Sequence, residues 1–347
     1  MSDYQPPEMY RPYPTRSHPL ADAAGRHAKD WARRMGMLGT FWEERDIDEL
    51  GAATFAARTH PDASESALHL LSEWHIWGFH LVAHIGDEYR RTRDIAGAKH
   101  FARRLPTFMP LDSAVVASPV NAAERGLADL WVRTAPSMPG ALREQLRRNV
   151  KSYGDSHVEE LSNLCQDRVP DPSGYLATRT QTFGVAWAHD LIRHTIDDRV
   201  PQEVFDTWPM RALLAAFFEA TGPQSDARTY REDVRGDTKV NNGVHVYTRF
   251  LGCPPQRAGE VLNSLGTERL RRFENLAITE VPALAVELGM GLADGERLLR
   301  HIDHLRQFTA GTHDWLCRER TPPARRPSAT KRLPGPPAAP TALLNLL

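Results

Sequence analysis

Cysteine is scarce in this sequence, and its copies lie in three separate parts of the chain. Cys165, Cys253 and Cys317 are too few and too scattered for a zinc knuckle or a disulfide framework. An odd number of cysteines suits reduced thiols, which are typical of reducing compartments. We therefore expect a cytoplasmic protein without structural disulfides.

Long apolar runs and an excess of one charge are also missing. No segment reaches the roughly 18 consecutive apolar residues of a membrane span, and the first residues lack a basic region followed by an apolar one. Lysine plus arginine (43) nearly balances aspartate plus glutamate (44). A nucleic-acid partner, which calls for a basic surface, is therefore not expected, and neither is export or a membrane span.

Strand-like alternation of apolar and polar residues is absent, whereas helical periodicity recurs along the chain. The 347 residues, 41% of them hydrophobic and 25% charged, suffice for one large core or two smaller ones. These patterns predict an all-α protein. The predicted helices cover residues 21–37, 46–59, 64–93, 95–105, 122–133, 142–165, 175–194, 209–220, 226–234, 240–250, 255–280 and 293–318, with Ser64 as a helix cap.

The two ends of the chain differ in composition from the middle. Residues 1–20 hold five prolines and three tyrosines, which predicts an extended strap. Residues 321–340 hold seven prolines and four basic residues without an acidic one, so residues 321–347 are predicted to be a disordered basic tail. A single helical domain over residues 21–320 is expected between them.

The stretch from residue 74 to 91 is the strongest single helix pattern. Trp74, Trp77, Leu81, Val82 and Ile85 recur at three- and four-residue steps, as on a helix with one packed face. The polar residues that follow share a neighbouring face of that helix: His80, His84, Asp87 and Glu88. They either form a group of polar ligands at one depth within the helical bundle or begin a solvated, charged helix end.

Several motifs in this order resemble those of bacterial class I terpene synthases, most nearly a single germacradienol/geosmin-synthase-type cyclase domain. They are Trp74-x-x-Trp77-x-Phe79, Glu160-Leu-Ser-Asn163, Arg168-Val-Pro-Asp-Pro172, Arg249-Phe-Leu-Gly-Cys253 and His313-Asp-Trp315. The resemblance covers nearly all of the predicted domain. It implies a class I terpenoid synthase α-helical bundle with a deep apolar cavity. There, three magnesium ions help to ionise an allylic diphosphate, and the resulting cation cyclises.

The family's first metal-binding motif is largely missing from this chain. The resemblance places its aspartate pair at Val82 and Ala83, which have no ligand atoms, and only Asp87 matches the later acidic position. Magnesium gives up its hydration reluctantly and needs carboxylates. The resemblance thus leaves Asp87 as a weak, degenerate metal ligand on this helix.

The family's second metal-binding motif keeps its spacing with altered residues. Ser225, Thr229 and Asp233 stand where an amide, a hydroxyl and a glutamate would lie at i, i+4 and i+8. The resemblance makes them weak metal ligands, and Pro223 is expected to kink or restart the helix before them. Without the resemblance, Ser225 and Asp226 would be interpreted as the cap of a surface helix.

For diphosphate binding, the resemblance implies Arg179, whose guanidinium suits phosphate oxygens. The family's terminal Arg-Tyr pair falls on Thr321 and Pro322, with Arg318 and Arg320 nearby.

Two further interpretations of the pattern concern a metal and a cavity. His80, His84 and Glu88, at four-residue steps, could hold a transition metal, although no separate Glu-x-x-His motif supplies ligands from a facing helix. A set of aromatic residues lines a cation-stabilising cavity or forms ordinary core. This set is Trp74, Trp77, Phe79, Phe183, Trp187, Trp208, Phe217, Phe218, Phe308 and Trp315.

Two functional hypotheses follow from the resemblance. The first is a terpene cyclase of unusual metal dependence, a carbon–oxygen lyase acting on a prenyl diphosphate such as farnesyl diphosphate with Mg²⁺ as cofactor. The second is a non-catalytic paralogue that uses its apolar cavity, or the family's homodimer surface, to bind an apolar ligand or a regulatory partner.

Overall fold

The computed structural model describes residues 4–39, 42–112, 117–195 and 200–317. Within these ranges the protein is a bundle of α-helices with short 3-10 turns, and it contains no strand beyond an isolated bridge between Leu38 and Trp42. The predicted all-α class is confirmed. The predicted tail, residues 321–347, and Arg318 and Arg320 lie outside the described residues.

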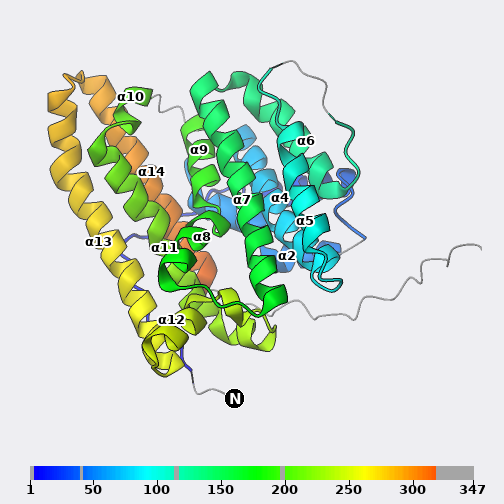
Figure 1. Ribbon diagram of the computed structural model, residues 1–347. Helices are drawn as coiled ribbons and strands as arrows, with labels where there is room; N and C mark the ends of the chain where they lie inside the picture. The colour runs from blue at the N-terminus through cyan, green and yellow to red at the C-terminus, as the bar shows by residue number, and fades with distance from the viewer. Residues whose placement is uncertain (1–3, 40–41, 113–116, 196–199, 318–347) are drawn as a thin grey trace, which may run out of the picture.

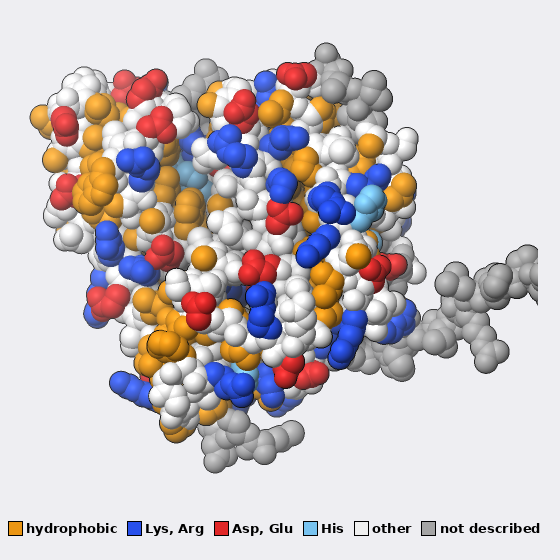
Figure 2. Space-filling model, viewed as in Figure 1, with side chains coloured by type: hydrophobic (Ala, Val, Ile, Leu, Met, Phe, Trp, Pro, Cys, Tyr) orange, Lys and Arg blue, Asp and Glu red, His pale blue; other side chains and the backbone are white. Residues whose placement is uncertain are grey.

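The helices pack together in one bundle (Figure 1). Their bounds are α1 Ala21–Arg34, α2 Glu44–Leu50, α3 Ala52–Thr59, α4 Glu65–Tyr89, α5 Ile95–Arg104, α6 Ala122–Thr134, α7 Gly140–Gln166, α8 Pro172–Thr182, α9 Val185–Thr195, α10 Gln202–Phe205, α11 Trp208–Arg235, α12 Gly243–Leu251, α13 Pro255–Glu287 and α14 Leu292–Cys317. None of the described helices is long and apolar enough to cross a membrane. On the face in Figure 2, acidic and basic side chains are interspersed.

Helix α4 runs through the core, as its periodicity predicts. Ser64 caps it, because its Oγ accepts a hydrogen bond from the Ala67 amide at 3.2 Å. Trp74 and Trp77 are fully buried. The Trp74 indole donates to Thr134 Oγ1 at 3.1 Å, and the Trp77 indole donates to the Ala123 carbonyl at 2.9 Å. Both tryptophans are therefore core residues whose one polar atom is satisfied by α6.

Helix α11 continues through Pro223, so the predicted restart of the helix at this proline is wrong. Packing explains the continuity. A side chain at Gly266 of α13 would meet the Ala220 carbonyl at 2.6 Å, so the two long helices lie very close beside the proline. Gly222 and Pro223 are themselves buried. This burial offsets the roughly 3 kcal/mol that an interior proline costs.

Two predicted helices are instead divided at glycines. The segment 175–194 is α8 and α9, separated at Gly184 with φ of 77°, and the segment 46–59 is α2 and α3, separated at Gly51 with φ of 66°. Both glycines adopt the left-handed conformation that other residues avoid. At Gly184 the break redirects the chain immediately after the helix that carries Arg179.

Residues 4–20 form neither helix nor strand, and lie along the outside of the bundle. The Tyr4 hydroxyl donates to the Ala227 carbonyl at 2.5 Å, and Tyr4 is 2% exposed. Asn263 of α13 donates to the Glu8 carbonyl at 2.8 Å, and the Tyr13 hydroxyl donates to Glu274 at 2.6 Å. The segment is thus held to α11 and α13 by buried and half-buried side chains.

Buried histidines make the stability of this fold depend on pH. Burial lowers the pKa of His75, His80 and His301 to about 3. The unfolded chain titrates near 6.5, so the stability that these neutral rings contribute is present above pH 6.5 and is lost as the pH falls. Burial raises the pKa of Asp190 to about 7 and of Asp226 to about 6. These two carboxyl groups therefore make the protein more stable as the pH falls, which opposes the effect of the histidines. The histidines outnumber them, since burial also holds the pKa of others low: His60, His189 and His313.

We predict that the free energy of unfolding falls between pH 7 and pH 5, by up to about 2 kcal/mol for each fully buried histidine. Urea titrations at both pH values measure this loss. His75→Phe should reduce it, because the ring no longer titrates, whereas His100→Gln on the exposed face of α5 should leave it unchanged. Equal stability of the parent at both pH values would contradict the prediction.

Candidate functional site

The C-terminal ends of α4 and α11 meet at one end of the bundle. Arg90, directly after α4, donates two hydrogen bonds to the backbone that follows α11, to the carbonyls of Gly236 and Asp237, both at 3.0 Å. The two segments that correspond to the metal-binding motifs of the family that this sequence resembles therefore face the same region. We call this region the mouth of the bundle.

The α4 side of the mouth offers few ligand atoms. Val82 is 36% exposed and Ala83 is half-buried, and neither carries oxygen. Asp87 and Glu88 are exposed at the end of the helix. The predicted ligand Asp87 is thus present on this side without a carboxylate one turn before it.

On the α11 side, the predicted ligands Thr229 and Asp233 lie together. The Thr229 hydroxyl donates to Asp233 Oδ2 at 3.1 Å, and the Asn242 amide donates to the same oxygen at 2.8 Å. Thr238 donates to Asp233 Oδ1 at 3.0 Å. Both carboxylate oxygens are therefore already hydrogen-bonded within the protein. Ser225 is buried in α11.

A buried ion pair in the mouth joins Arg179 of α8 to Asp226 of α11. Arg179 Nη2 lies 2.8 Å from Asp226 Oδ1, and both side chains are largely buried. Asp226 Oδ2 accepts from the Tyr175 hydroxyl and from the Gly243 amide, each at 2.8 Å. Gly222 makes room for this pair, since a side chain there would lie 3.1 Å from Arg179 Cγ.

Asp226 is the candidate site residue that sequence reasoning missed. The alternative interpretation of Ser225 and Asp226 as a surface cap is wrong, because both are buried inside α11. One available signal was spacing: Gly222 and Asp226 lie four residues apart and therefore share a helix face. That face packs against Arg179.

Electrostatics in the mouth are dominated by carboxylates around one arginine. Burial disfavours the charge on Arg179, but the neighbouring charges of Asp226, Glu160 and Asp233 outweigh it and raise the Arg179 pKa above its ordinary value. Burial also raises the pKa of Asp226 to about 6, against the opposing effect of Arg179. With all three carboxylates ionised, they and the one arginine carry a net negative charge together. An anion that binds among them would therefore need a proton or a cation as compensation.

The described residues do not fit the magnesium site that the resembling family implies. Val82 and Ala83 supply no oxygen, and the oxygens of Asp233 are occupied by Thr229, Thr238 and Asn242. Across the described part of the chain, no three His, Cys, Asp or Glu side chains are grouped to hold a metal ion. The transition-metal hypothesis for His80, His84 and Glu88 finds no support in this geometry either.

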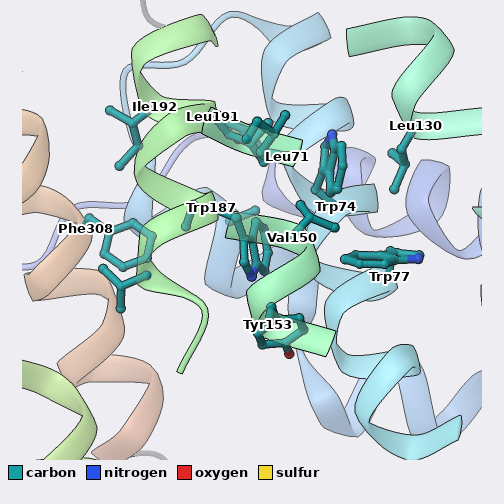
Figure 3. Close-up of a cluster of buried hydrophobic side chains, with 14 of the residues drawn as sticks. Leu71, Trp74, Trp77, Leu130, Val150, Tyr153, Trp187, Leu191, Ile192 and Phe308 are labelled. Atoms are coloured by element: carbon teal, nitrogen blue, oxygen red, sulfur yellow. The ribbon is translucent and has the colours of Figure 1, made fainter. Parts of the chain in front are cut away.

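Several aromatic side chains lie in one cluster of buried hydrophobic residues (Figure 3). Trp187 of α9 lies among Trp74, Tyr153 and His75, with ring centroids 6.1, 5.8 and 5.4 Å away. Its ring packs on Gly78 of α4, where an added side chain would lie 3.1 Å from Trp187 Cζ2. These aromatics form packed core. The candidate cavity residue Trp208 instead lies on the surface, 59% exposed at the start of α11.

Comparison with known proteins gives consistent matches along most of the chain. A family model described as terpene synthase family 2, C-terminal metal binding, matches residues 73–272. Pristinol synthase from Streptomyces pristinaespiralis is 25% identical over 311 residues, which cover 88% of this chain and 81% of that protein. Pentalenene synthase from Streptomyces avermitilis is 27% identical over 316 residues, which cover 89% of this chain and 90% of that protein.

Solved structures share the same bundle. Hedycaryol synthase in complex with HEPES matches with a TM-score of 0.76 and 19% identity, covering 90% of this chain and 98% of that one. A structure of α-eudesmol synthase matches with a TM-score of 0.79 and 17% identity, covering 89% and 98%. At these identities the likeness concerns the fold.

We predict that Asp226→Ala lowers the free energy of unfolding by about 3–5 kcal/mol, because it leaves Arg179 buried without its counter-charge. The double variant Arg179→Ala/Asp226→Ala should lose less than the sum of the single variants. Asp155→Ala, which breaks an exposed pair with Lys151, should cost less than about 1 kcal/mol. Urea denaturation measures the parent and all four variants, and strictly additive losses would show that the pair is not coupled.

Proposed function

The chain belongs to the bacterial class I terpene synthases, and from that membership we propose that it is a terpene cyclase acting on a prenyl diphosphate such as farnesyl diphosphate. The proposed working unit is the helical domain of residues 21–320 together with the strap of residues 1–20. Arg179 is proposed as the diphosphate-binding residue. Asp87, Ser225, Thr229 and Asp233 are the remaining positions of the metal motifs, so the dependence on Mg²⁺ is proposed to be weak or unusual.

One observation carries the proposal: the guanidinium of Arg179 keeps unused donor capacity at the mouth. Its Nη2 pairs with Asp226, and its Nη1 reaches Thr182 Oγ1 only at 3.4 Å. The buried Nε–H has no acceptor among the described residues. Buried donors are nearly always hydrogen-bonded, so an oxygen from outside the chain is the natural partner. A diphosphate oxygen supplies that acceptor with a charge-assisted bond.

Asp226 and Tyr175 orient the arginine for this role. The carboxylate holds one edge of the guanidinium, and the Tyr175 hydroxyl and the Gly243 amide fix the carboxylate in turn. Burial raises the Asp226 pKa to about 6, which makes its carboxylate the group able to take up a proton when an anion binds Arg179. Such a proton removes one of the negative charges that would repel a diphosphate.

A non-catalytic role is the second candidate, and a specific observation favours it. The mouth lacks oxygen at Val82 and Ala83, and the oxygens of Asp233 are occupied within the protein. Without charge neutralisation at the leaving group, a prenyl diphosphate would bind without ionising. In that case the chain would act as a binding or regulatory partner, for example in a homodimer.

We predict that Arg179→Ala weakens binding of farnesyl diphosphate by about 1.5–3 kcal/mol, the range of a hydrogen bond to a charged group. Calorimetry measures the affinity, and Arg148→Ala, which removes an exposed arginine of α7, should leave it unchanged. In parallel, prenyl diphosphates of several lengths are incubated with Mg²⁺ or with a chelator, and extractable products are analysed.

Cyclised products would establish the cyclase, and their persistence in the chelator would establish the unusual metal dependence. Binding that depends on Arg179 without any product would favour the non-catalytic role. Equal affinity of parent and Arg179→Ala would remove Arg179 from the site.

A further inference from the structure

A pocket lies beside α11, next to the N-terminal segment. It has a volume of about 200 Å³. Glu8 and Arg11 of the N-terminal segment, Gln224 and Arg228 of α11 and Asn263 of α13 contribute to its wall. The Tyr4 hydroxyl, bonded to the Ala227 carbonyl, anchors the segment beside it.

The pocket and the Arg179 site lie on opposite faces of α11. Asp226 points to Arg179, whereas Gln224 and Arg228 line the pocket. Residues two positions apart on an α-helix differ by about 200° around its axis. A ligand in the pocket would therefore not touch the Arg179 pair.

Gln224, which lines the pocket, carries a buried donor that lacks a partner among the described residues. Its side chain is 1% exposed, and its Oε1 lies 2.9 Å from His313 Nε2. Because an amide oxygen only accepts, His313 donates this bond. Gln224 Nε2 has no hydrogen-bond partner among the described residues. An unmade hydrogen bond at a buried amide is costly, so an acceptor in the pocket would be stabilised there.

Two guanidinium groups add positive charge to the same wall. Arg11 and Arg228 both line the pocket, and neither forms an ion pair or hydrogen bond within the described chain. The charge of Arg11 reaches the interior, where it helps burial to lower the pKa of His313 to about 4. Glu8 is the one acidic residue of the lining, and its backbone carbonyl is engaged by Asn263. The lining therefore has a net positive charge and an excess of donors.

We propose that this pocket binds a small phosphate-type oxyanion, either inorganic or the phosphoryl group of a small metabolite. Two guanidiniums and an amide N–H match tetrahedral oxyanions, which accept several charge-assisted hydrogen bonds at once. A cation is disfavoured by the arginines, and an apolar ligand would leave Gln224 Nε2 unsatisfied. The bound anion bridges Arg11 of the N-terminal segment and Arg228 of α11, and so fastens that segment to the helix behind Arg179.

Calorimetric titration of the full chain with inorganic phosphate, and separately with diphosphate, in the presence of a chelator tests the proposal. A saturable site is expected for the parent. Arg228→Gln and Arg11→Gln should each weaken it at least tenfold, and Arg228→Lys should weaken it less than Arg228→Gln. Arg179→Ala should leave it unchanged, which separates this site from the proposed diphosphate site at the mouth.

Arg257→Gln is the matched control, because Arg257 lies on α13 outside the pocket and pairs with the exposed Glu260. It should not alter the affinity. Absence of saturable binding to both anions would overturn the proposal. So would an unchanged affinity in Arg228→Gln, measured on protein whose thermal melt shows it to be folded, or an equal loss in Arg257→Gln.

Discussion

The buried ion pair between Arg179 and Asp226 is the interaction on which the mouth of the bundle depends. It connects α8 to α11 and, through the Gly243 amide, to the beginning of α12. A buried charge is tolerated only when it is paired and hydrogen-bonded, so each of these contacts supports the others. Gly222 permits the close approach of Arg179 to α11. The geometry of this end of the protein follows from satisfying one arginine and one aspartate away from water.

This constraint also shapes the chemistry available at the mouth. The chain has the terpene synthase fold, but the carboxylates near Arg179 are engaged in hydrogen bonds and an ion pair within the protein. Asp233 accepts from three neighbours, and Asp226 is engaged by Arg179, Tyr175 and Gly243. The remaining donor capacity belongs to Arg179. The described residues of the mouth therefore do not assemble a metal site, and the diphosphate role proposed for Arg179 needs a proton or a cation to compensate the neighbouring carboxylates.

Sequence patterns predicted much of the fold because the long helices are strongly periodic. The α4 helix, its Ser64 cap and the all-α class all follow from spacing and capping residues. The breaks at Gly51 and Gly184 and the continuity at Pro223 did not, since each depends on the packing of segments distant in sequence. The roles proposed for Arg179 and the metal-motif positions came from the resemblance. The pairing of Asp226 with Arg179 depends on the packing of α8 against α11, which the sequence does not show. The four-residue spacing of Gly222 and Asp226 places both on one helix face, but it does not identify Arg179, which is distant in sequence, as the partner.

We propose that Arg179 marks a diphosphate site whose first metal-binding motif lacks its two carboxylates at residues 82 and 83. The most direct test is a thermal melt of the parent and of Val82→Asp/Ala83→Asp, in a chelator and in magnesium plus diphosphate. Because ligands stabilise only the state that binds them, we predict a larger rise in melting temperature for the double variant than for the parent. Val132→Asp, on the exposed face of α6, controls for added charge and should behave as the parent. An equal rise in the parent and the double variant would contradict the claim, because residues 82 and 83 would then not face the diphosphate site.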